Sequence, residues 1–219
     1  MKKPGSKSKR TAASNGVTKS RGADSQAERI LNFWLTPDNG AEDGLQIWSR
    51  WFVPDPDFDS LCKSLFLSNY RDAACGRLDN WKKTPRTCLA LVLLLDQFPR
   101  NMFRGTARAF ATDAKAREMS RHAIASGFDR ELPQIMRMFF YLPLEHSEHL
   151  NDQMESVRLA VALADEYAES PEGTAIRKSA ESHFEIIRRF GRFPGRNRAL
   201  GRRSTKEELE FLKQANAGY

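Results

Sequence analysis

Polar side chains that could transfer protons or bind anions gather in three stretches, which also hold aromatic residues and prolines. They are DQFPRNMFRG (96–105), YLPLEHSEHLNDQ (141–153) and RRFGRFPGRNRALGRR (188–203). Carboxylates and imidazoles act as general acids and bases, and the planar guanidinium group of arginine suits phosphate or carboxylate. The three stretches therefore indicate either a pocket for a small anionic compound or a set of structural ion pairs.

Eleven residues of these stretches are candidates for a functional site. The catalytic candidates are Asp96, Glu145 and His146. The candidates for binding a ligand are Arg100, Asn101, Arg104, Glu148, Arg189, Arg192, Arg196 and Asn197. Adjacent residues of a helix point about 100° apart, so either Glu145 or His146 can serve a given site, but not both. In the structural alternative, the arginines cap the last carbonyls of helices and pair with nearby acids.

Two segments of opposite charge weaken the case for an external anion. Residues 145–172 contain eight acids and one arginine, and residues 188–203 contain seven arginines and no acid, so the two segments can pair within the fold. A metal site is not predicted, because neither H-E-x-x-H nor the E-x-x-H pairs of di-iron bundles are present. No motif of a catalytic nucleophile, such as G-x-S-x-G, is present. No glycine-rich phosphate-binding motif is present either, so no cofactor is predicted.

The basic character of the chain lies in its first 22 residues, which hold seven lysines and arginines and no acid. We expect residues 1–22 to form a disordered basic tail and residues 23–219 to form a single all-α domain. The formal net charge is also +7, so the remainder is neutral and nucleic acid is an unlikely partner. No membrane span, secretory signal or C-x-x-C pair is found, which favours a cytoplasmic protein.

Helix signals recur along the chain, and they predict about eight helices without a confident strand. The capping box Ser25–Glu28 is expected to open the first helix. Thr84 and Pro85 precede the apolar run CLALVLLL, which predicts a central helix buried on nearly all sides. Pro99 disfavours the α conformation of the preceding residue, Phe98, so this helix should end near Gln97.

The helices of the second half are also predicted from capping residues and prolines. One carries IMRMFFY and should stop before Pro143, and the longest should begin near Leu144. On that longest helix Glu145 and His149 would share a face, four residues apart. A further helix spans roughly 174–190, and the capping box Ser204–Glu207 should open a terminal helix.

The motif segments LLLDQFPRNMFRGTARAFATDAKA, FFYLPLEHSEHLNDQMESV and HFEIIRRFGRFPGRNRALGRRST, in this order, closely resemble the bacterial domain-of-unknown-function 924 family. The resemblance covers the chain from about Ala27 to the C terminus. It implies an all-α fold similar to tetratricopeptide-repeat proteins, with antiparallel helix pairs stacked around a concave side, and it implies no established reaction. Gly195 stands where the family often has histidine; if that histidine transfers protons in relatives, this protein is impaired or uses another group.

A short motif that occurs twice in the chain indicates where a pocket is expected to form. Gln97–Asn101 and Arg192–Asn197 both place Phe-Pro near a helix end and then arginine and asparagine. We expect these two segments to meet near Glu145 and His146, with Arg100 and Arg196 no more than about 20 Å apart.

Our leading functional hypothesis is a helical scaffold that binds a peptide or protein partner through its concave surface. The alternative is an enzyme, or a binding protein, that holds a small anionic ligand in an Arg/Glu/His pocket. Nucleic-acid binding is the least favoured. An exposed groove lined by the polar motif residues would favour the scaffold, whereas burial of these residues around one site would favour the small ligand.

Overall fold

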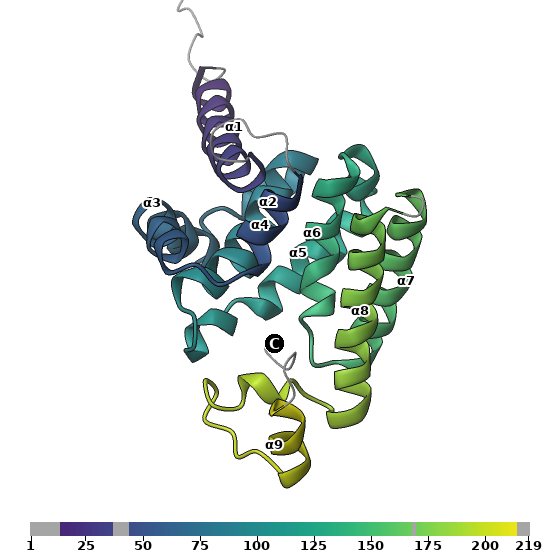
Figure 1. Cartoon of the computed structure of the whole chain (residues 1–219). Coiled ribbons are helices and arrows are strands. Elements are labelled where there is room, and N and C mark those ends of the chain that lie inside the picture. The colour runs from purple at the N-terminus through teal and green to yellow at the C-terminus, as the bar shows by residue number, and fades with distance from the viewer. Residues whose placement is uncertain (1–13, 37–43, 168–169, 214–219) are drawn as a thin grey trace, which may run out of the picture.

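The computed structural model describes residues 14–36, 44–167 and 170–213, and in these ranges it has only helices and the loops between them. The all-α prediction is confirmed (Figure 1). Nine α-helices fall in the described ranges: α1 Ser14–Leu35, α2 Gly44–Phe52, α3 Pro56–Ala74, α4 Pro85–Met102, α5 Asp113–Ala125, α6 Gln134–Glu145, α7 Leu150–Glu166, α8 Pro171–Phe190 and α9 Lys206–Leu212. The short 3-10 helices are η2 Asp79–Lys83, η3 Ala107–Phe110, η4 Phe128–Glu131 and η5 Pro194–Arg196.

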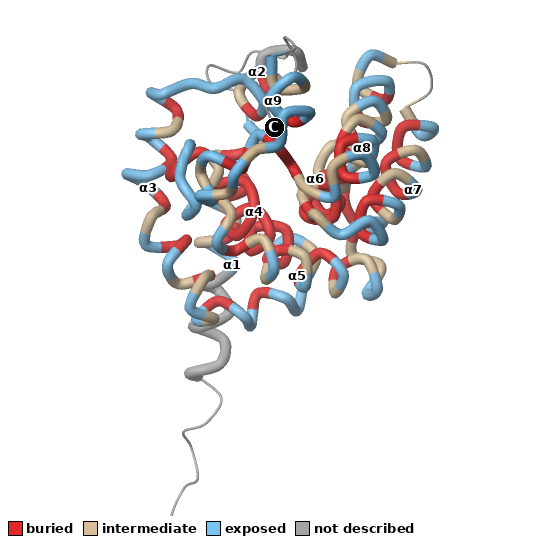
Figure 2. The backbone as a smooth tube through the Cα atoms, turned by 90° about the horizontal axis from the view of Figure 1, so that it is seen from below, coloured by how far each residue is buried: buried red, intermediate tan, exposed pale blue. Residues whose placement is uncertain are grey.

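Helix α4 lies at the centre of the molecule, as its apolar run predicts. Every residue from Cys88 to Leu95 is fully buried, and α1, α3, α5 and α6 pack around the helix. In Figure 2 the buried residues accordingly gather along α4 and α6. Pro85 occupies the first turn, where a missing N–H group breaks no hydrogen bond.

The predicted end of the central helix near Gln97 is wrong, because α4 continues through Pro99 to Met102. A proline inside a helix leaves the carbonyl four residues earlier without its N–H donor. Here that carbonyl belongs to Leu95, and the hydroxyl of Thr112 donates to it at 2.6 Å. A tertiary hydrogen bond therefore replaces the lost helical one and keeps Asp96 and Arg100 on the same helix.

Pro143 is likewise internal to a helix, and the prediction that a new helix begins near Leu144 is also wrong. Helix α6 includes Pro143 and ends at Glu145, His146 is its C-cap, and α7 begins at Leu150. Glu145 and His149 therefore do not share a helical face. Glu145 and His146 instead lie at a helix end, where the chain turns and their side chains reach different neighbours.

The chain after α8 folds back against the rest of the molecule. Helices α7 and α8 lie side by side, and α8 ends at Gly191, whose φ of 67° favours glycine (Figure 1). Phe193 is fully buried and packs with Ile186 and Ile187. The terminal capping box is one residue later than predicted, because Thr205 caps α9 together with Glu208.

The N-terminal predictions concern residues that are described only in part. Helix α1 begins at Ser14, so it includes residues 14–22 of the predicted tail, and Ser25 is not its start. Residues 1–13 lie outside the described ones. In the described part of the chain, no helix is both long and apolar enough to span a membrane.

Candidate functional site

The buried Asp96 of α4 and His146, the C-cap residue of α6, form a hydrogen-bonded pair. The Nδ1 atom of His146 lies 2.9 and 3.0 Å from the two carboxylate oxygens of Asp96, which is 1% exposed. Gln97 also donates to Asp96, at 2.5 Å. The carboxylate thereby fixes the orientation of the imidazole, and Nε2 has no hydrogen-bond partner among the described residues.

Two arginines that are far apart in the sequence, Arg100 and Arg196, meet at one carboxylate next to this pair. Arg100 donates to both oxygens of Asp113, at 2.9 and 3.1 Å, and its Nη1 also lies 3.2 Å from Asp96. Arg196 donates to Asp113 at 3.3 Å. The predicted proximity of Arg100 and Arg196 is therefore confirmed. We call Asp96, Arg100, Asp113, His146 and Arg196 the arginine–aspartate cluster.

Arg196 is the least satisfied member of the arginine–aspartate cluster. It is 7% exposed, and its guanidinium carbon lies 4.7 Å from the ring centre of Phe110 and 4.4 Å from that of Phe193. A guanidinium group has five N–H donors. Only the 3.3 Å hydrogen bond to Asp113 engages them within the described part of the chain. The remaining donors are available to an acceptor outside the described residues.

The charges of the cluster hold Asp96 ionised and His146 neutral near pH 7. Burial alone would raise the pKa of Asp96, but Arg100 and the hydrogen bonds of His146 and Gln97 lower it well below its usual range. Burial and the positive charges of Arg100 and Arg196 lower the pKa of His146 to about 4, against the opposing effect of Asp96. Nδ1 of the neutral ring therefore carries the proton, and Nε2 is a free acceptor.

Arg196 keeps its positive charge in this environment. Burial and the neighbouring Arg100 lower the pKa of Arg196 to about 10, although Asp113 and Glu148 oppose the change. An arginine whose charge is costly to bury gains from an additional anion nearby. The electrostatics of the cluster thus favour a negatively charged ligand at Arg196.

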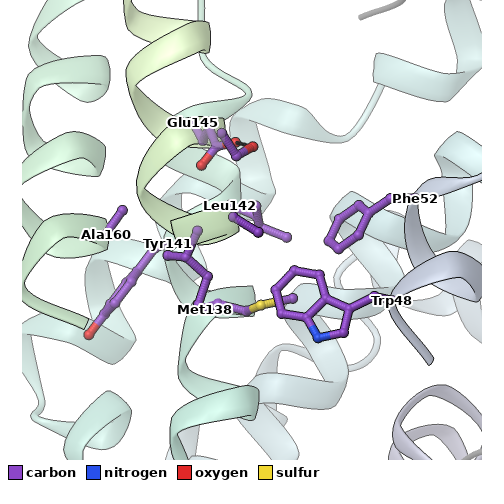
Figure 3. Close-up of a pocket in the computed structure, with 10 residues that line it drawn as sticks. Trp48, Phe52, Met138, Tyr141, Leu142, Glu145 and Ala160 are labelled. Carbon is purple, nitrogen blue, oxygen red and sulfur yellow. Dashed lines mark hydrogen bonds between the residues drawn. The ribbon is translucent and has the colours of Figure 1, made fainter. Parts of the chain in front are cut away.

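Glu145 belongs to a neighbouring arrangement rather than to the cluster itself. Its Oε1 accepts a hydrogen bond from Ser179 at 2.7 Å and lies 3.1 Å from Nδ1 of His183, both on α8. The rings of His183 and His146 are 6.1 Å apart, so the two arrangements are adjacent. Glu145 also lines a cavity of about 220 Å³ between α2, α6, α7 and α8 (Figure 3).

Six of the predicted ligand-binding residues pair elsewhere. Asn101 and Arg104 both donate to Asp59 on α3. Glu148 accepts from Arg202 and from the backbone N–H of Phe193, which ties the C-terminal segment to the turn after α6. The others contact α9: Arg192 and Asn197 bond Glu208, and Arg189 bonds Glu207.

The structural interpretation of the basic segment is therefore partly right. Arg202 pairs with Glu148 of the acidic segment 145–172, as the complementary charges suggest. Arg192 and Arg196 pair instead with acids outside that segment, Glu208 and Asp113. Arg192 and the buried Glu208 join the segment to the cap of α9. These contacts hold the basic segment, which contains Arg196, against α9 and the turn after α6.

Sequence reasoning did not identify Asp113, Ser179 or His183 as site residues. Asp113 is the first residue of α5, and an acid at a helix N-terminus is ordinary in any helix. Nothing local in the sequence shows that two arginines converge on it. His183 lies on an apolar helical face, which suggests packing, and only the fold places it next to Glu145.

The protein belongs to the family described as bacterial protein of unknown function (DUF924), whose model matches residues 30–216. The chain is also similar to the solved structure of a protein of unknown function from Agrobacterium tumefaciens. The two share 37% sequence identity and a TM-score of 0.74, over 88% of this chain and 99% of the other. No curated protein matches this chain. The predicted family is thereby confirmed.

Proposed function

We propose that the protein is an enzyme acting on a small anionic compound, which Arg196 binds and for which His146 transfers a proton. The single observation that carries this proposal is the buried Asp96–His146 pair next to an arginine with unused donors. Perturbed titratable groups in a buried polar cluster are typical of catalytic sites. Structural ion-pair networks perturb such groups too, but the unused donors of Arg196 favour the interpretation as a ligand site.

The chemistry follows from the protonation states. Asp96 accepts a hydrogen bond from the Nδ1–H group of His146, so the proton stays on Nδ1 and Nε2 is available to take a proton from the substrate or from a water molecule. In the free protein His146 is a weak base, because its pKa is lowered to about 4. A bound anion would offset the charges of Arg100 and Arg196, raise this pKa and strengthen the base. Substrate binding would thus prepare the proton transfer.

The scaffold hypothesis, with a peptide or protein partner on a concave surface, has less support. Asp96, Glu145 and Arg196 are each less than a tenth exposed, so they offer little surface to a macromolecule. Arg100 and His146 are mostly buried as well. A site of this kind suits a small compound better than a peptide.

A ligand screen with a matched pair of variants tests the proposal. We expect a carboxylate or phosphate compound to raise the melting temperature of the wild type, and Arg196→Met to abolish this rise because it keeps the stacked side chain but removes the charge. Arg198→Met is the control, because Arg198 is exposed on the same segment. Equal stabilisation of the wild type and Arg196→Met, or no stabilisation by any anion, would refute binding at Arg196.

Turnover separates catalysis from binding alone. For a compound found by the screen, His146→Gln should lower kcat strongly and change Kd little, because the glutamine amide can still donate to Asp96 while it cannot take up a proton. Unchanged kcat in this variant would show that His146 does not transfer the proton.

A further inference from the structure

The cavity between α2, α6, α7 and α8 has apolar walls and one acidic end. Trp48 and Phe52 of α2 form one wall, with ring centres 5.4 Å apart, and Met138 and Leu142 of α6 lie beside them (Figure 3). Phe52 is 49% exposed, so a large apolar side chain faces solvent at this place. A mostly apolar cavity with a few polar groups is the usual form of a small-molecule site.

Glu145 supplies the polar group of this cavity. It is 4% exposed, and its Oε1 accepts from Ser179 and faces His183. Within the described part of the chain, no hydrogen bond reaches its Oε2, and no lysine or arginine forms an ion pair with it. A buried carboxylate without a lysine or arginine partner is costly, so the cavity favours a ligand that brings a positively charged donor.

From this geometry we infer that the cavity binds a primary amine attached to an aromatic or bulky aliphatic body. The ammonium group donates to Oε2 of Glu145, and the body fills the space between Trp48, Met138 and Leu142. This site is independent of the proposed anion site, because it uses neither Arg196 nor His146.

Calorimetry with three matched compounds tests the inference. The probes are 3-phenylpropylamine, 3-phenylpropanol and 3-phenylpropionate, which share one apolar body and differ in the charge of the head group. We expect the amine to bind about 10- to 100-fold more tightly than the alcohol, as a charge-assisted hydrogen bond to a buried group would give. The carboxylate should bind most weakly, because its charge repels that of Glu145.

Two variants and one control locate the binding. Glu145→Gln should abolish the preference for the amine over the alcohol. Ala175→Phe should block all three compounds, and it is expected to fold normally because Ala175 is exposed at the cavity wall. Glu181→Gln removes an exposed acid of the same helix and should leave the Kd of the amine unchanged.

Three results would overturn the inference: equal binding of amine and carboxylate, an unchanged preference in Glu145→Gln, or undiminished binding in Ala175→Phe. Arg196→Met should bind the amine as the wild type does. This outcome would hold even if the proposed anion site failed its own test, so the two proposals are tested separately.

Discussion

The two Phe-Pro segments of the chain resemble each other in sequence but serve the molecule differently. In the first, 97–101, Phe98 and Pro99 are buried within the last turns of α4. In the second, 192–197, Phe193 and Pro194 follow the glycine that ends α8 and enter a short 3-10 helix. Arg100 of the first segment and Arg196 of the second both donate to the same carboxylate, Asp113.

The two arginines differ in how fully they are bonded. Arg100 donates to both oxygens of Asp113 and to the backbone carbonyl of Asp96, at 2.7 Å. Among the described residues, Arg196 has one side-chain hydrogen bond, of 3.3 Å, and two aromatic neighbours. We infer that Arg100 holds the cluster together, whereas Arg196 is available to a ligand. Variants at the two positions should therefore separate stability from binding.

The largest effect is expected from Arg100→Ala. The variant leaves the buried Asp96 and the partly buried Asp113 with less positive charge, and breaking a buried ion pair typically costs about 3–5 kcal/mol. Urea unfolding should show this loss, and Arg188→Ala, whose pair with Glu185 is exposed, should leave the midpoint unchanged. A midpoint for Arg100→Ala equal to that of the wild type would mean that Arg100 does not hold the cluster.

Stability should also depend on pH through His146. Its pKa is about 4 in the folded protein against an ordinary 6.5, so the unfolded chain takes up a proton first as the pH falls. The free energy of unfolding contributed by this group is complete above pH 6.5 and is lost between pH 6.5 and about 4, by at most about 1.4 kcal/mol per pH unit. His146→Gln should show a smaller slope in this range, and an identical slope would contradict the lowered pKa.

A smaller effect is expected where a tertiary hydroxyl replaces the hydrogen bond that Pro99 removes. Thr112→Val leaves the buried carbonyl of Leu95 without a donor, which should cost about 1–3 kcal/mol in urea unfolding. Thr106→Val is the control, because Thr106 is exposed and its hydroxyl bonds a carbonyl only three residues away. Equal losses in the two variants would argue against a special role for Thr112.

The smallest effect on stability is expected from Gly195→His, which places an imidazole next to Arg196 in the sequence. Gly195 is exposed and lies in a 3-10 helix, so the change should stay within about 0.5 kcal/mol. The new imidazole becomes positive below about pH 6.5 beside Arg196, so an anion should bind more tightly as the pH falls. A Kd with the same pH dependence as the wild type would place residue 195 outside the site.

Sequence reasoning succeeded where a signal is local and failed where the partner is distant. The apolar run of α4 and its N-terminal proline predict a buried central helix, and the motifs single out Asp96, His146, Arg100 and Arg196. The helix end at Gln97 was wrong because the proline rule describes only the chain's own hydrogen bonds, whereas Thr112 supplies one from another element. The role of Asp113 depends on two arginines that only the fold brings together.

The most direct test of the proposed anion site is the titration of His146 by NMR, with and without sulfate. Sulfate remains charged over the range of interest, and sodium chloride at the same ionic strength controls for screening. We predict that sulfate at Arg196 raises the pKa of His146 clearly above about 4, and that Arg196→Met removes this response. A pKa that is the same in sulfate and in chloride would contradict anion binding next to His146.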